Sequence, residues 1–211
     1  MDLTAPYAII CPSLDGPVLE VLAHTTRPLS GREVARLSRR GSERGVRLTL
    51  HRLADQGLVT TLEAGRGSFY TLNRDHLGAP LVEQLMHLRS DLIVRLRETI
   101  EGWLIKPSHV SLFGSAARGD GNALSDVDLL LVRRSEVASE DSGWRDQLNG
   151  LAADVHRWTG NNASLVEVSS DQLLATLRRE EAIVSSLRSD AIVLFGSEFY
   201  ALASQLNGGP L

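Results

Sequence analysis

The sequence predicts an α+β fold in two parts joined by a long helix, and three observations support that prediction. The first third holds three short amphipathic segments followed by two short strands. From Pro80 to Leu104, apolar residues then recur at every third or fourth position. The remainder alternates apolar strands with amphipathic helical segments. At 211 residues the chain is long enough for two small domains with separate cores.

The composition is that of a soluble globular protein, with 43% hydrophobic and 23% charged residues, and it excludes several other classes. No apolar run approaches the roughly 20 residues that a membrane-spanning helix needs. The first residues lack the basic and apolar regions of a signal peptide. Cys11 is the only cysteine, which excludes an internal disulfide and a cysteine-based zinc site. We therefore expect a cytoplasmic protein with no membrane partner.

The net charge of −4 conceals an asymmetry along the chain. The segment from His24 to Arg74 contains ten arginines and four acids, a local charge of +6, so the rest of the chain carries −10. Such a difference indicates different partners for different segments. The basic segment suits a polyanion, and the acidic remainder suits metal cations or solvent.

Three helix signals follow one another in the first third. Asp15 is placed to cap a first helix that has Pro17 in its first turn. Ser30 and Glu33 form a capping-box pattern ahead of a second helix. A third helix is expected over residues 43–57, ending at a glycine. Its inward face consists of Val46, Leu50 and Leu53.

Two strands, "LVTTLEA" and "FYTLN", follow with the tight turn "GRGS" between them. Three helices and a hairpin in this order resemble the winged helix-turn-helix of small bacterial transcription regulators over residues 15–73. The resemblance predicts a DNA-binding domain over residues 1–76, with the third helix in the major groove and the hairpin turn at the backbone or minor groove. A merely solvated basic face and a protein-interaction module remain alternatives. The expected DNA-contacting residues are Ser42, Arg44, Arg47, Thr49, His51 or Arg52, and Arg66 at the turn.

A connecting helix is expected over residues 77–106, ended by Lys106 and Pro107. Its apolar stripe is suited either to packing within the chain or to pairing with a second copy in a homodimer. The stripe consists of Leu81, Leu85, Leu88, Leu92, Leu96, Ile100 and Trp103.

Two aspartates stand at the start of an apolar strand in the last third. Residues 109–113, "HVSLF", indicate a buried strand, and "DVDLLLV" from Asp126 indicates the next. Because side chains alternate along a strand, Asp126 and Asp128 face the same way, roughly 6–7 Å apart along the backbone. Two carboxylates at that spacing repel each other at the start of a core strand, unless divalent cations lie between them.

The segments that carry these aspartates resemble the active-site signature of the DNA polymerase beta-like nucleotidyltransferases, in particular of their minimal bacterial branch. The first is Gly114-Ser115-x-Ala117-Arg118-Gly119, and the second is Ser125-Asp126-x-Asp128-Leu129. The resemblance covers roughly residues 107–200 and predicts a nucleotidyltransferase domain over residues 107–205 with a mixed sheet and flanking helices. Within it we expect a helix over residues 172–180, a closing strand over 191–196 and a terminal helix, with residues 206–211 as a disordered tail.

The resemblance also implies roles for individual residues. Asp126 and Asp128 would hold two Mg²⁺ ions, with Mn²⁺ as an alternative, and the substrate would be an NTP. The family implies that Gly114 lets the backbone approach the phosphates and that Ser115 bonds the β- or γ-phosphate. Arg118 would contact phosphate or pair with Asp120 on the surface, and Ser125 completes the nucleotide-binding set. The implied reaction is attack by an acceptor hydroxyl on the α-phosphate with release of pyrophosphate.

Active members of this family add a third carboxylate from a later strand, which corresponds here to "ASLVEVSS". Glu167 is the only acid on that strand, and it is predicted as the third catalytic and metal-binding residue. The hydrophobic pattern also permits an alignment that puts Ser164 at this position. The two residues lie on opposite faces of a regular strand, so only one alignment can hold.

Two functions follow from these features. The first is an enzyme that transfers a nucleoside monophosphate to a hydroxyl of a protein, a small molecule or a nucleic acid, coupled to a DNA-binding domain. The second is a transcription regulator in which a weakly active or inactive nucleotidyltransferase domain senses nucleotide. Fold alone does not decide between them.

Overall fold

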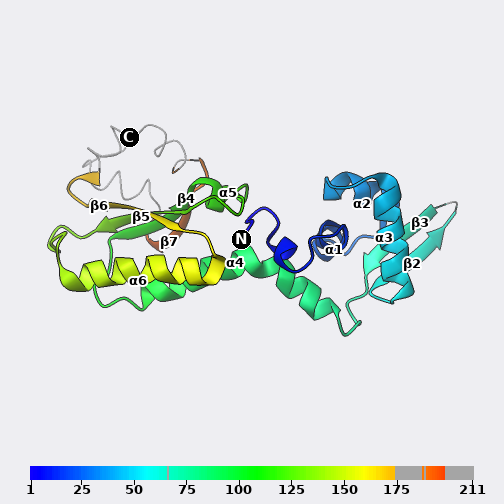
Figure 1. Cartoon of the computed structure of the whole chain (residues 1–211), viewed down its shortest axis with the longest axis horizontal. Coiled ribbons are helices and arrows are strands. Elements are labelled where there is room, and N and C mark those ends of the chain that lie inside the picture. Colours follow the sequence, from blue (N-terminus) through cyan, green and yellow to red (C-terminus); the bar gives the residue numbers. More distant parts are fainter. Residues whose placement is uncertain (66, 174–186, 188, 198–211) are drawn as a thin grey trace. The chain divides into compact units, whose positions relative to one another are not determined.

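A computed structural model of the protein describes residues 1–65, 67–173, 187 and 189–197 (Figure 1). The chain divides into two compact units, whose boundary falls inside one long helix. The N-terminal unit is Ala5–Arg89, and the C-terminal unit combines Met1–Thr4 with the chain from Ser90 onward. The expected terminal helix, the tail and residues 174–180 of the expected helix lie outside the described residues.

In the N-terminal unit, three α-helices accompany a small antiparallel sheet of strand order β1-β3-β2 (Figure 1). The long helix α4 contributes its first half to the same unit. The elements are η1 (Pro6–Ile9), α1 (Asp15–Ala23), β1 (Leu29–Ser30), α2 (Gly31–Ser38), α3 (Glu43–Asp55), β2 (Val59–Ala64), β3 (Gly67–Leu72) and α4 (Ala79–Glu101).

The capping-box prediction for α2 is confirmed. The Ser30 hydroxyl accepts a hydrogen bond from Glu33 N at 3.3 Å, and Ser30 N donates to the Glu33 carboxylate at 2.9 Å. The backbone bond from Ser30, with help from its hydroxyl and from Arg27, lowers the pKa of Glu33 to about 2. The backbone N–H groups of Ser30 and Glu33, which have no partner within the helix, are thereby satisfied by side chains.

Helix α3 is capped by Ser42, whose hydroxyl accepts a hydrogen bond from Gly45 N at 3.1 Å. The prediction of its inward face is also confirmed, because the three apolar residues expected there are buried in the core of the unit. These residues are Val46, Leu50 and Leu53.

The C-terminal unit contains a four-stranded mixed sheet of order β6-β5-β4-β7 (Figure 1). The β5–β6 pair is parallel, whereas β4 pairs antiparallel with both β5 and β7. The mixed sheet that the sequence predicts is therefore present. Its elements, which follow α4, are β4 (His109–Phe113), α5 (Gly114–Arg118), β5 (Val127–Arg133), α6 (Ser142–Thr159), β6 (Ala163–Ser169) and β7 (Ile192–Gly196).

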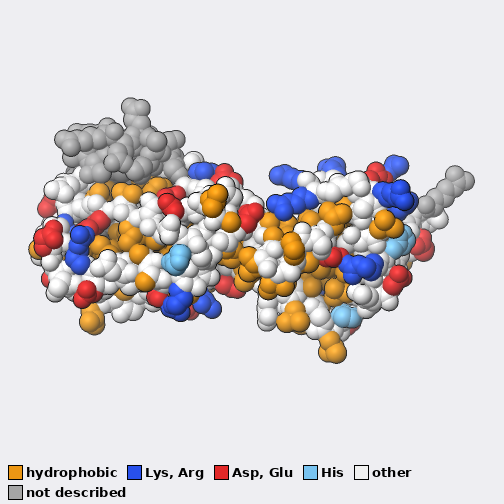
Figure 2. All heavy atoms as spheres, in the orientation of Figure 1, with side chains coloured by type: hydrophobic (Ala, Val, Ile, Leu, Met, Phe, Trp, Pro, Cys, Tyr) orange, Lys and Arg blue, Asp and Glu red, His pale blue; other side chains and the backbone are white. Residues whose placement is uncertain are grey.

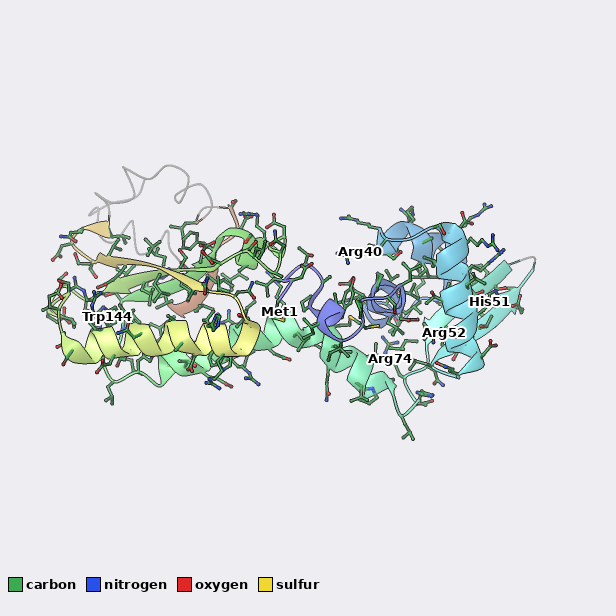
Figure 3. The ribbon with its side chains drawn as sticks, in the orientation of Figure 1. Met1, Arg40, His51, Arg52, Arg74 and Trp144 are labelled. Atoms are coloured by element: carbon green, nitrogen blue, oxygen red, sulfur yellow. The ribbon has the colours of Figure 1, made fainter. Side chains whose placement is uncertain are left out.

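The two faces of this sheet differ. One face packs on α6 and on the second half of α4, with Leu129 and Leu131 of β5 in the same core as Trp144 (Figure 3). The opposite face carries a smaller apolar cluster that includes Phe113 and Leu130. Because side chains alternate along β5, Asp128 shares the second face with Leu130. The face of the sheet on which a residue lies therefore decides whether it can meet Asp128.

The first four residues pack with the C-terminal unit. Leu3 is buried in the core of that unit, and Thr4 N donates a hydrogen bond to Gly121 O at 3.2 Å. Nothing in the hydrophobic pattern of the sequence predicts this placement. Among the helices that the structure describes, none has the length and hydropathy required to span a bilayer.

Candidate nucleotide and metal site

The site is built where β4 ends and β5 begins. Gly114 follows β4 with φ of +68°, and a Cβ placed on it would overlap the Asp128 carboxylate. Both facts require glycine, because the left-handed backbone is costly for other residues and the neighbouring carboxylate leaves no space. Phe113 is the register partner of Asp128 in the antiparallel β4–β5 pair. The end of one strand and the start of the next thus bring the Gly-Ser turn against the aspartate.

The two aspartates differ in their surroundings. Asp128 lies within β5 and is half-buried, whereas Asp126 precedes the first strand residue and is exposed. Burial raises the pKa of Asp128 above its ordinary value of 3.8, although a hydrogen bond from Ser164 opposes the rise. The charge of Asp126 raises this pKa further, which shows that the two carboxylates interact. Such a pair is stabilised by a bound cation.

Ser164 occupies the position on β6 that directly neighbours Asp128. The parallel register pairs Asp128 with Ser164, and the Ser164 side chain hydrogen-bonds to the carboxylate. Of the two alignments that the sequence permits for "ASLVEVSS", the structure supports the one that places Ser164 beside the aspartates. A hydroxyl therefore lies next to Asp128 at the sheet position where the family resemblance implies a third carboxylate.

Glu167 does not join the aspartates, and its prediction as third ligand is corrected by the structure. It pairs in register with Leu131, on the face that packs on α6. Its carboxylate accepts hydrogen bonds from Arg133 Nε and Trp144 Nε1, both at 2.9 Å, and from Arg145 Nη1 at 3.4 Å. These three donors hold the carboxylate on the sheet face that packs on α6, opposite to the face that carries Asp128, so it does not reach the aspartates.

Arg118 at the end of α5 forms ion pairs with two aspartates. Its Nε donates to Asp120 at 2.9 Å, and its Nη1 lies 3.7 Å from Asp190 Oδ2, in the loop before β7. The sequence left phosphate contact and pairing with Asp120 as alternatives, and the pairing is present. Asp190 was not expected at this edge of the sheet. It lies there because β7, which it precedes, pairs with β4.

The two serines of the expected nucleotide set lie at the loop that leads to Asp126. The Ser115 hydroxyl packs against Gly121, where a Cβ would come within 2.8 Å of Ser115 Oγ. The Ser125 hydroxyl accepts a hydrogen bond from Asn122 N at 3.0 Å and so closes the loop on itself. Ser115 therefore packs against the loop that leads to Asp126, and Ser125, the residue before Asp126, stabilises the turn of that loop.

The donor set fits magnesium in an open site. Within the described part of the chain, no three His, Cys, Asp or Glu residues are arranged to hold a metal ion. Mg²⁺ is commonly held by one or two carboxylates together with waters and substrate phosphates, and not by an all-protein cage. Asp126 and Asp128 provide two such carboxylates beside the Gly-Ser turn. The residues present thus suit Mg²⁺ delivered with a nucleotide.

The residues expected to contact DNA are distributed unevenly over the N-terminal unit. Arg44 and Arg47 are exposed on α3, whereas Thr49 is half-buried and Ser42 serves as the helix cap. Arg52 (labelled in Figure 3) forms an ion pair with Asp15 of α1 and is thereby engaged within the unit. Arg66 lies outside the described residues.

Residues 89–175 match the family model of the nucleotidyltransferase domain. The C-terminal unit therefore carries a nucleotidyltransferase domain, which is the class of enzyme predicted from the Gly-Ser and aspartate motifs. No curated protein sequence matches the chain.

Two solved structures are similar to the chain at low scores. One is a toxin–antitoxin crystallised with AMP-PNP, with 16% identity, a TM-score of 0.37, and coverage of 55% of this chain and 84% of that chain. The other is a mutant of the toxin–antitoxin MntA–HpeT, with 13% identity, a TM-score of 0.37 and the same coverage. The assignment of the domain rests on the family match.

Proposed function

We propose that the protein is a metal-dependent nucleotidyltransferase that transfers a nucleoside monophosphate from an NTP to an acceptor hydroxyl with release of pyrophosphate. The observation that carries this proposal is the contact between the left-handed Gly114 and the carboxylate of Asp128, with Ser115 and Asp126 beside it. A Gly-Ser turn pressed against two interacting carboxylates brings phosphate-binding and cation-binding groups to one point.

Each residue of the site then has a task. Asp126 and Asp128 would hold Mg²⁺, and the Ser115 hydroxyl would bond a phosphate oxygen. Bound Mg²⁺ would supply charge neutralisation of the triphosphate and of the leaving pyrophosphate. Gly114 keeps the carboxylate of Asp128 and the phosphate-binding turn within contact distance of each other. Arg118 would add positive charge near the phosphates when it leaves its aspartate partners.

A second candidate function is supported by Ser164. With a hydroxyl next to Asp128 and Glu167 engaged on the other face, the residues that the structure describes give the site two carboxylates and no third one to deprotonate an acceptor. A site of this kind suits a nucleotide sensor that binds NTP and Mg²⁺ but turns over slowly. This second function is a transcription regulator controlled by nucleotide.

Isothermal titration of the full chain with each NTP and Mg²⁺, with pyrophosphate followed on the same samples, tests both functions. The transferase predicts binding and, with water or an added hydroxyl compound to accept the nucleoside monophosphate, pyrophosphate release, both lost in Asp126→Ala. The sensor predicts binding without release. Absence of binding for every NTP would exclude both functions.

We further propose that the N-terminal unit is a winged helix-turn-helix that binds DNA. Support comes from the order of three helices and a hairpin and from the exposed arginine side chains of α2 and α3 (Figure 2). Neither Arg44 nor Arg47 forms an ion pair with another residue that the structure describes. Leu48, the residue after Arg47 on α3, is 60% exposed and suits contact with a thymine methyl group.

Binding of fluorescent duplex DNA, measured as a function of salt, tests this second proposal. Replacement of Arg44 and Arg47 by alanine should reduce the slope of log affinity against log salt by about two, because each phosphate contact contributes about one. Arg134→Ala, which removes an exposed charge from the C-terminal unit, is the matched control. An unchanged slope in the double variant would remove α3 from the interface.

A further inference from the structure

The loop that precedes Asp126 is anchored by a buried amide. Asn161, which lies between α6 and β6, is 2% exposed. Its Nδ2 donates to Ser125 O at 2.9 Å and lies 3.4 Å from both Asn122 O and Ala123 O. One side chain from a distant part of the sequence therefore faces three carbonyl groups of a single loop. These contacts from one amide nitrogen to three carbonyl oxygens fix the path of the backbone immediately before Asp126.

The orientation of this amide is set from its other side. The α-amino group of Met1 (labelled in Figure 3) donates to Asn161 Oδ1 at 2.6 Å and to Thr159 O at 2.7 Å. An ammonium group must face the amide oxygen, so the amide nitrogen must face the loop. Asn161 N also donates to Thr159 Oγ1 at 3.0 Å, which holds the residue itself. The segment Met1–Thr4 thus supports the anchor and contacts the same loop through Thr4.

The two aspartates of the site depend on different supports. Asp128 is fixed by the β4–β5 ladder and by Ser164. Asp126 precedes the ladder, is exposed, and takes its position from the loop before it. On the strand side, the next residue is held by β6: Val127 N donates to Asn162 O at 2.8 Å, and Val127 pairs in register with Ala163.

We infer that Asn161 is a positioning residue of the nucleotide and metal site and acts on Asp126 through the loop of residues 121–125. This inference rests on the proposed function of the site. In this role Asn161 acts from a buried position behind the loop, through the loop carbonyls. The Asn161 amide holds the loop that positions Asp126, as strand pairing positions Asp128. Through Met1, residues 1–4 are bound to the same amide.

The decisive variant is Asn161→Asp, because its added charge and its effect on the loop would change the Mg²⁺ requirement in opposite directions. The substitution keeps an oxygen toward Met1 but replaces the donor with an oxygen that faces three carbonyl oxygens. By Coulomb attraction alone, an added negative charge near the site would lower the Mg²⁺ requirement. A displaced loop would raise that requirement, and changes around metal-binding residues typically weaken metal affinity by roughly 10-fold to 100-fold.

The control is Asn162→Asp, which adds the same charge one residue away at an exposed position. Full-length wild type and both variants would be titrated with Mg²⁺ at a fixed ATP concentration. Amide exchange of residues 120–127, followed by mass spectrometry without nucleotide, gives a second readout that does not depend on binding. We expect Asn161→Asp to raise the half-saturating Mg²⁺ concentration about tenfold and to speed exchange of this loop. Asn162→Asp should leave loop exchange unchanged and should not raise the half-saturating Mg²⁺ concentration.

The outcomes separate the inference from the function on which it rests. Unchanged loop exchange in Asn161→Asp overturns the inference, whatever the wild type binds. If the wild type binds Mg²⁺ and ATP, an unchanged or lower half-saturating Mg²⁺ concentration in Asn161→Asp also overturns the inference. Wild type that binds no ATP contradicts the proposed function, while faster loop exchange would still support Asn161 as the anchor of the loop. If Asn161→Asp does not fold, Asn161→Ala replaces it and is subject to the same two readouts.

Discussion

Ser164 of β6 lies beside Asp128 of β5 in the parallel register, and its side chain hydrogen-bonds to the aspartate. The pair lies on the sheet face that also carries Leu130, away from α6. Ser164 is therefore the position from which a longer acidic side chain would reach the two aspartates. The hydroxyl that it carries lowers the pKa of Asp128 but offers no charge to a metal ion.

Ser164→Asp is predicted to convert a two-carboxylate site into a three-carboxylate site. Without Mg²⁺, the added charge beside Asp128 should destabilise the C-terminal unit by about 1–2 kcal/mol, because like charges repel in a half-buried position. With Mg²⁺ and NTP, pyrophosphate release should rise by roughly 10²-fold, the usual contribution of a positioned general base. Kinetics of pyrophosphate release and thermal melts with and without Mg²⁺ check both effects.

The matched control is Ser164→Asn, which has nearly the same size as aspartate but no charge, and it should not raise turnover. A Ser164→Asp protein that binds Mg²⁺ more tightly without faster release would favour the sensor function over the transferase.

Gly114→Ala is predicted to abolish binding of Mg²⁺ and nucleotide. The substitution places a Cβ against the Asp128 carboxylate and forces alanine into φ of +68°, a strain of about 1–2 kcal/mol. Gly65→Ala is the control, because Gly65 has φ of +64° and nothing within 4 Å of its Cβ position. Calorimetric titration should show normal nucleotide binding in the control. Normal binding in Gly114→Ala would mean that the turn can relax away from the aspartate.

The order of elements and the aspartate site could be predicted because their signals are local. The spacing of Val46, Leu50 and Leu53 is that of one face of a helix. The Gly-Ser and Asp-x-Asp motifs stand at the end of one expected strand and the start of the next, so together they predict that Gly114 and Asp128 meet. The choice between Ser164 and Glu167 could not be made in the same way. Both lie on one short strand, and only the register of that strand against β5 decides which face each occupies.

Long-range contacts were beyond the reach of the sequence for a different reason. Asn161, Asp190 and the Met1–Thr4 segment meet the site through chain folding and not through any periodic pattern. Likewise, α3 offers several arginines of the same kind, and no local signal distinguishes Arg52, which pairs with Asp15, from Arg47, which forms no ion pair with a residue that the structure describes. Such distinctions depend on which charged residues from other elements come within reach.

Glu167→Gln is predicted to lower stability without changing Mg²⁺ affinity. Removal of its charge leaves Arg133, whose side chain is only 11% exposed, without its anionic partner. We expect a loss of about 2 kcal/mol in the free energy of unfolding of the C-terminal unit, below the cost of breaking a fully buried pair because glutamine still accepts from Trp144. Denaturant unfolding and Mg²⁺ titration of the same preparation measure the two quantities.

The corresponding control for Glu167→Gln is Glu136→Gln, since Glu136 and Arg134 form an exposed pair at 3.9 Å. That change should stay within about 0.5 kcal/mol. Weaker Mg²⁺ binding by Glu167→Gln at unchanged stability would return Glu167 to the metal site and contradict its assignment to the α6 face.

Asp128→Asn is predicted to stabilise the protein in the absence of metal. Burial raises the pKa of Asp128 in the folded state above the ordinary value of 3.8 that applies to the unfolded chain. Between these two values the folded state holds more protons than the unfolded state, so stability falls as pH rises through this window. At neutral pH the ionised carboxylate is therefore a destabilising group, and its neutral replacement removes that contribution.

Thermal melts from pH 4 to pH 7.5 in EDTA check this sign: Asp128→Asn should melt higher than wild type at neutral pH, and the difference should shrink toward the acidic end. With Mg²⁺ and nucleotide the order should reverse, because ligand binding stabilises only the protein that can hold it. Asp146→Asn, exposed on α6, should track wild type throughout. If the wild type melts above Asp128→Asn in EDTA at neutral pH, contacts within the protein stabilise the ionised Asp128 carboxylate. The prediction that this carboxylate destabilises the metal-free protein would then be wrong.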